Sequence, residues 1–99
     1  MKAAPLALGL AALALLAVPA RADYKDSYRK GMELAEKGNW PEVARHMRAA
    51  LEEQPREGEQ VKLYGMRFEL YLPHYYLGLA LFNGGDCEGA LRAWDSSQS

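Results

Sequence analysis

The chain has 99 residues, a length that suits one small domain. Its 12 basic and 13 acidic residues leave a formal net charge of −1, which argues against a nucleic-acid binder because such proteins need a basic face for the phosphates. Hydrophobic residues make up 49% of the chain and charged residues 25%, so the composition is that of a folded protein. The single cysteine, Cys87, excludes an internal disulfide framework and a multi-cysteine zinc site.

Residues 1–22 have the pattern of a secretory signal peptide. Lys2 supplies a positive start, and an apolar run rich in Leu and Ala covers 6–18. Ala20 and Ala22 are small residues at the two positions that a signal peptidase reads, so we expect cleavage after Ala22 and a periplasmic or secreted protein. The run is short for a membrane span, which needs ~20 apolar residues. Membrane association follows only if the segment stays uncleaved as an anchor.

The mature chain opens with two predicted helices joined by a tight turn. Asp23 is a suitable N-cap for a helix that runs to about Lys37, and Gly38 follows as a residue that accepts positive φ past a helix end. Pro41 suits the first turn of the next helix, where its missing N–H costs no hydrogen bond, and Pro55 ends that helix. Apolar residues recur at spacings of three and four in both segments, which predicts a helical hairpin.

An insert over 58–70 separates this hairpin from the next one. Its apolar residues include stretches of strict alternation with Lys62, Arg67 and Glu69 between them. Alternation favours an extended chain, and large apolar side chains tend to leave water, so we expect an ordered flap packed on the helices. The alternative is a lengthened start to the following helix. The apolar residues of this segment are Val61, Leu63, Met66, Phe68 and Leu70, and Leu72 follows directly after it.

From Tyr71 the chain returns to the helix–turn–helix pattern. Pro73 suits a first helical turn, and the very apolar stretch over 75–83 is predicted to be helical. Gly84-Gly85 makes the turn, and Asp86 caps a last helix that carries Trp94. At an offset of 47 residues the two halves of the mature chain agree at several positions, which indicates tandem units. The identical pairs are Tyr24 and Tyr71, Tyr28 and Tyr75, Gly31 and Gly78, Leu34 and Leu81, Gly38 and Gly85, and Arg45 and Arg92.

These spacings resemble the tetratricopeptide repeat, a helix–turn–helix unit of about 34 residues. The first repeat covers 24–57, and a second, truncated repeat covers 71–99. The resemblance implies an all-α fold of tandem helical hairpins in one domain over 23–99, preceded by a signal-peptide helix, as in exported bacterial tetratricopeptide proteins. The matching residues are Gly31, Leu34, Gly38, Trp40, Val43, Met47, Ala50 and Pro55 in the first repeat, and Leu77, Gly78, Leu81, Gly85, Ala90 and Trp94 in the second.

In tetratricopeptide arrays the first helix of each unit lines a concave groove, so the resemblance implies that this chain binds a partner's peptide or helix. The residues of this chain at the groove positions of the repeat are mostly aromatic and apolar, with a few charged ones. Its residues are Lys25, Tyr28, Arg29, Met32, Glu36, Leu72, Tyr75, Tyr76, Leu79 and Asn83. One alternative is that the insert covers much of this face. Another is a structural N-terminal part of a longer envelope protein, which packs on further repeats or on a second copy.

No pattern in the chain points to catalysis, a cofactor or a metal. His46 and His74 lie on different predicted helices and have no histidine or cysteine partner at helical spacing, so we expect a surface His46 and a packed or capping His74. Cys87 is expected as a small buried residue near a turn, with a reactive thiol as the alternative. No nucleophile, base and orienting group form a recognisable arrangement, so no enzyme is expected.

Overall fold

The structure, a computed structural model, describes residues 23–63 and 68–97. The predicted signal peptide and Met66 lie outside the described residues. The described part is mostly helical, as expected, and adds one small antiparallel sheet. Its elements are α2 (Tyr24–Glu36), α3 (Trp40–Glu53), β1 (Gln60–Lys62), β2 (Phe68–Leu70), α4 (Pro73–Asn83) and α5 (Cys87–Asp95).

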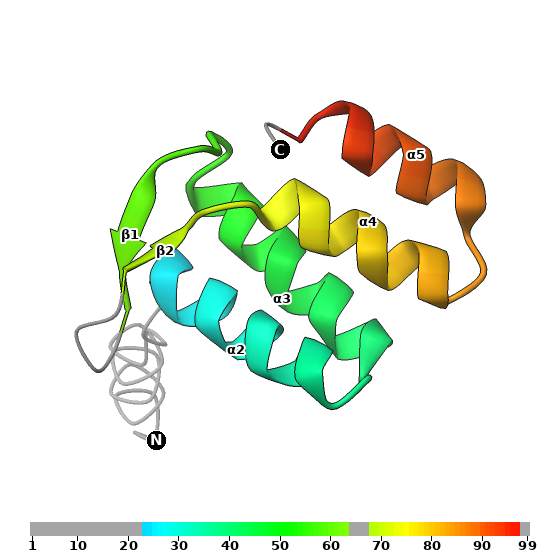
Figure 1. Cartoon of the computed structure of the whole chain (residues 1–99), viewed down its shortest axis with the longest axis horizontal. Helices are drawn as coiled ribbons and strands as arrows, with labels where there is room; N and C mark the ends of the chain where they lie inside the picture. The colour runs from blue at the N-terminus through cyan, green and yellow to red at the C-terminus, as the bar shows by residue number, and fades with distance from the viewer. Residues whose placement is uncertain (1–22, 64–67, 98–99) are drawn as a thin grey trace, which may run out of the picture.

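The helices lie side by side in chain order, each packed on the next (Figure 1). α2 contacts α3, α3 contacts α4, and α4 contacts α5, while α2 also touches α4. Strands β1 and β2 form a hairpin beside the start of α2 (Figure 1). The α2–α3 pair therefore has α4 as a further helical neighbour, whereas α5 packs mainly on α4.

The predicted helix ends are confirmed to within one or two residues. The Asp23 carboxylate accepts a hydrogen bond from the Lys25 backbone N–H at 3.4 Å, and the Asp86 carboxylate accepts one from Gly89 at 2.9 Å. These caps satisfy N–H groups that have no partner inside their helices. Gly38 and Gly85 take φ values of 73° and 93° in the two turns, a conformation that favours glycine.

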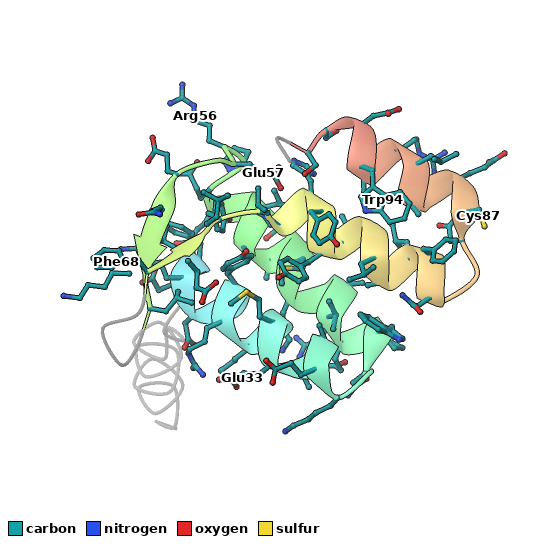
Figure 2. All side chains as sticks on the ribbon, in the orientation of Figure 1. Glu33, Arg56, Glu57, Phe68, Cys87 and Trp94 are labelled. Atoms are coloured by element: carbon teal, nitrogen blue, oxygen red, sulfur yellow. The ribbon has the colours of Figure 1, made fainter. Side chains whose placement is uncertain are left out.

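Helix α4 begins at Pro73, the residue predicted for its first turn, and Glu57, just before the insert, supplies its cap. Leu72 precedes the helix and has no side-chain acceptor to offer. The Glu57 carboxylate accepts a hydrogen bond from the His74 backbone N–H instead, at 2.5 Å (Figure 2). A carboxylate at this end of a helix also meets the positive end of the helix dipole. His74 is packed, as expected, and its backbone rather than its side chain takes part in this cap.

In each helical hairpin a glycine of the first helix lies against a large residue of the second. A Cβ on Gly31 would lie 2.5 Å from the terminal methyl carbon of Met47. A Cβ on Gly78 would overlap the indole ring of Trp94, whose Nε1–H donates to the Tyr75 carbonyl at 3.1 Å. The absence of a side chain therefore lets each pair of helices approach closely, and Figure 2 shows Trp94 on α5.

The insert is an extended hairpin, and the alternative of a longer helix is excluded over its described residues. Gln60 pairs with Leu70, and Lys62 pairs with Phe68. Successive strand residues point to opposite faces, so Val61 enters the core while Phe68 and Leu70 stay on the outer face, 62% and 46% exposed. The expectation that the apolar residues of the insert are all packed is therefore wrong for these two (Figure 2 labels Phe68).

Two buried tyrosines fasten the insert to the helices. The Tyr28 hydroxyl donates to the Leu70 carbonyl at 2.7 Å and accepts from the Leu72 N–H at 3.1 Å. The Tyr71 hydroxyl donates to the Gln54 carbonyl at 2.8 Å, directly after the end of α3. It also lies 3.2 Å from the Ala50 carbonyl, which accepts from the Gln54 backbone N–H as well. The two rings meet edge to face with centroids 5.0 Å apart.

Candidate peptide-binding hollow

The structure gathers four of the ten predicted groove residues around one hollow of about 300 Å³. Met32 and Glu36 come from the end of α2, and Tyr76 and Leu79 come from α4. The spacing of four along α2 and three along α4 places each pair on one helix face. We call this site the α2–α4 hollow, and its full lining is Met32, Ala35, Glu36, Trp40, Glu69, Tyr76 and Leu79.

Three lining residues were missed by sequence reasoning. Trp40 is the first residue of α3, and Glu69 is the middle residue of β2, so both come from elements outside the first helix of either hairpin. Ala35 lies on α2 three residues after Met32, and this spacing was a signal that could have found it. Nothing in the sequence places a residue of β2 in one hollow with residues of α2 and α4, so Glu69 could not be assigned to the site in advance.

Tyr28 requires a correction, because it lies in the core and not on an accessible groove. Its side chain is 1% exposed, since the insert covers this part of α2 through the Leu70 and Leu72 contacts. Leu72 is half-buried beside it. The alternative that the insert covers the face is therefore correct for the start of α2, while the end of α2 stays open at the hollow.

The remaining predicted groove residues lie outside the lining of the hollow. Arg29 bridges Asp26 at 2.7 Å and Glu33 at 2.8 Å along α2, and these carboxylates raise the pKa of its guanidinium. The Lys25 ammonium stands 6.0 Å from the centre of the Tyr24 ring. The final two predicted residues are on α4: Tyr75, which is 38% exposed, and Asn83, whose amide donates to the Leu79 carbonyl at 2.8 Å.

The α2–α4 hollow is apolar and aromatic with two carboxylates. Burial, the neighbouring Tyr75, and the charges of Glu69 and Glu36 together raise the pKa of the Tyr76 phenol. Both carboxylates therefore act on the same hydroxyl, although they come from different elements. The Tyr76 phenol remains protonated and can donate a hydrogen bond. The site combines apolar contact area, aromatic faces, a hydroxyl donor and negative charge.

A second hollow of about 300 Å³ lies between α3 and the end of α4. It shares Trp40 with the first hollow, and it carries one basic and one acidic residue, Arg48 and Asp86. Opposite charges at one site give little net potential to attract a charged ligand. Its other residues are Pro41, Ala44, Ala80, Leu81 and Gly84.

The histidines and the cysteine form no chemical centre. Over the described residues, no group of His, Cys, Asp and Glu is arranged to hold a metal ion. His46 is partly covered, 4.0 Å from Glu42, and burial lowers the pKa of its imidazole. Cys87 is exposed, so its predicted burial is wrong. It is the first residue of α5, at the outer end of the helix (Figure 2).

Comparisons with known proteins add no relative. Neither a protein-family model, nor a curated protein, nor a solved structure matches this sequence. Within residues 23–63 and 68–97, no helix is long and apolar enough to cross a membrane.

Proposed function

We propose that this chain is an exported helical-repeat module of the tetratricopeptide type that binds a segment of a partner protein in the α2–α4 hollow. The observation that carries the proposal is the hollow itself, an aromatic and apolar site formed where α2, α3, β2 and α4 meet. The signal-peptide pattern of residues 1–22 supports export.

The size of the site favours a peptide over a small-molecule ligand. Pockets that enclose a drug-sized ligand measure roughly 300–1,000 Å³, so this hollow lies at the lower limit of that range. One or two side chains of a peptide fit such a volume, while the rest of the peptide contacts the surface around it. Tyrosine and tryptophan suit this role because they offer large contact area with little loss of conformational freedom.

The test is selection of ligands from a display library of random short peptides on the full chain, followed by affinity measurement. Tyr76 and Tyr75 are adjacent, but Tyr76 lines the hollow and Tyr75 does not, so they form a matched pair. We expect Tyr76→Ala to weaken the selected peptides about tenfold or more, and Tyr75→Ala to change affinity less than about twofold.

Two outcomes would contradict the proposal: a library in which no peptide is enriched, or equal losses from both tyrosine variants. Tyr76 also packs edge to face on Tyr28, with ring centroids 5.9 Å apart, so its variant is checked for folding by circular dichroism. Leu79→Ser is the second variant, because it shortens another α4 side chain of the lining and leaves the Tyr28 and Tyr76 rings in place. It is expected to weaken the same peptides.

A structural role is the second candidate, supported by the apolar surface of the second hairpin. Phe82 and Leu91 are each more than half exposed, and the Phe82 ring lies 5.9 Å from that of Trp94. Such a surface would pack on further repeats or on a second copy of the chain. Light scattering of the mature protein tests self-association. A monomer at all concentrations would contradict the second-copy form of this role.

A further inference from the structure

We propose that the α2–α4 hollow selects a partner segment carrying a lysine or arginine beside a large apolar residue. The cationic side chain would lie between Glu36 and Glu69, and the apolar residue would contact Met32 and Leu79. This inference rests on the proposed function and names the chemistry of the partner for that same site. Its basis is charge complementarity inside an otherwise apolar hollow.

Glu36 differs from the other acidic residues of α2 in having no cation beside it. Asp26 pairs with Arg29 and Lys30, and Glu33 pairs with Arg29. Among the described residues, Glu36 belongs to none of the ion pairs. The last turn of α2 contains no basic residue, and Lys37, which follows it, is exposed and outside the lining of the hollow. The negative end of the helix dipole adds to the charge of Glu36 here.

Glu69 reaches the hollow from β2, and Glu36 reaches it from the end of α2. The charges of both act on the Tyr76 phenol, which lines the same hollow. Two carboxylates line this hollow, so a cation bound there is attracted by both. Glu36 is exposed, so this attraction acts in contact with water and is weakened by salt.

The walls of the hollow suit the rest of a basic side chain. Trp40 and Tyr76 supply aromatic rings, whose faces attract guanidinium and ammonium groups. Met32 and Leu79 supply apolar surface for the methylene stem of lysine or arginine. An acidic ligand would meet repulsion instead. Residues 23–99 are also acidic as a whole, because they hold all 13 acidic residues and only 10 of the 12 basic ones. This negative charge agrees with a preference for a basic ligand.

The experiment repeats the random-peptide selection with charge variants of the full chain. On the natural chain we expect lysine or arginine to be enriched at one peptide position next to an apolar residue. Replacing that basic residue by methionine should lower affinity about tenfold at low salt, and the difference should shrink as salt is raised. The double variant Glu36→Gln with Glu69→Gln should bind the two peptides equally.

A charge-reversed variant and a matched control sharpen the result. Glu36→Lys with Glu69→Lys should select aspartate or glutamate at the same peptide position. Glu33→Gln removes a carboxylate from the same helix that lies outside the lining, and it should leave the preference for a basic residue unchanged.

The outcomes separate this inference from the proposed function. If peptides are enriched through apolar residues alone, or if the glutamine double variant keeps the basic preference, the inference is wrong while the binding function stands. If no peptide is enriched on the natural chain, both are wrong. Circular dichroism of each variant confirms that the fold is kept, which is expected because glutamine has the shape of glutamate.

Discussion

In both helical hairpins a glycine of the first helix packs against a large residue of the second helix, but the two large residues are buried to different extents. In α2–α3, Gly31 packs against Met47, which is fully buried. In α4–α5, Gly78 packs against Trp94, which is only partly buried. The first pair has α4 and the insert as further neighbours, whereas α5 packs mainly on α4. The same spacing of small and large residues therefore brings helices together in both places, and the surrounding elements decide how much surface leaves water.

The tyrosines at corresponding positions show the same difference. Tyr28 and Tyr75 are identical residues at an offset of 47, yet Tyr28 is buried, and its hydroxyl contacts Leu70 of the insert and Leu72 just after it. Tyr75 is exposed, and its ring contacts the neighbouring Tyr76 at a centroid distance of 5.2 Å. One tyrosine therefore holds the fold together, and its counterpart stays at the surface.

Shortening the large residue of each hairpin should give the largest effects and reveal the difference directly. Met47→Ala leaves a cavity in the core, and we expect the free energy of unfolding to fall by about 2–5 kcal/mol. Trp94→Ala removes a partly exposed ring and should cost about 1–2 kcal/mol. Urea unfolding followed by circular dichroism measures both. Equal losses would contradict the unequal burial of the two hairpins.

Removing one hydroxyl tests the link between the insert and α2. Tyr28→Phe leaves the Leu70 carbonyl and the Leu72 N–H without their partner, and it should lower the free energy of unfolding by about 1–3 kcal/mol. Tyr75→Phe is the matched control and should change it by less than about 0.5 kcal/mol. Hydrogen exchange at the Leu72 amide should become faster in the first variant alone. Unchanged exchange would argue against this link.

The smallest expected effect is a loss of stability at high pH, which the buried phenols of Tyr28 and Tyr71 should cause. Burial raises the pKa of Tyr28 and of Tyr71 above the ordinary value of 10.0. Because the folded pKa is the higher one, their stabilising contribution is complete below pH ~10 and is lost as the pH rises above that value. The free energy of unfolding should therefore decrease on the alkaline side.

Tyrosine variants separate this decrease from the titration of other groups. The alkaline loss should be smaller in Tyr28→Phe than in the natural chain, and Tyr75→Phe should lose as much as the natural chain does. Urea unfolding at a series of pH values from about 9 to 11 measures the slopes. The same slope in all three proteins would contradict a contribution from the buried phenol.

Much of the helical fold could be predicted because its signals act within a few residues. Asp23 and Asp86 cap nearby N–H groups, Gly38 and Gly85 take positive φ directly after helices, and apolar residues recur at helical spacing. The start of α4 at Pro73 was predicted too, but its cap was not, because it comes from Glu57, 17 residues before His74. A contact of that kind leaves no local pattern to read.

The candidate site likewise combines residues that local sequence signals could place with one that only the packing of distant segments places. Met32, Glu36, Tyr76 and Leu79 follow from the positions of residues on two predicted helices, whereas Glu69 joins them only because β2 folds back beside α2. Tyr28 belongs to the same helical pattern and is nevertheless hidden, because the insert lies over it. Hydrogen bonding and hydrophobic periodicity along the chain are enough to decide which segments become helices and which faces are apolar. Whether an apolar face ends in the core or at an open hollow depends on which distant segment covers it, and that is settled only when the elements pack together.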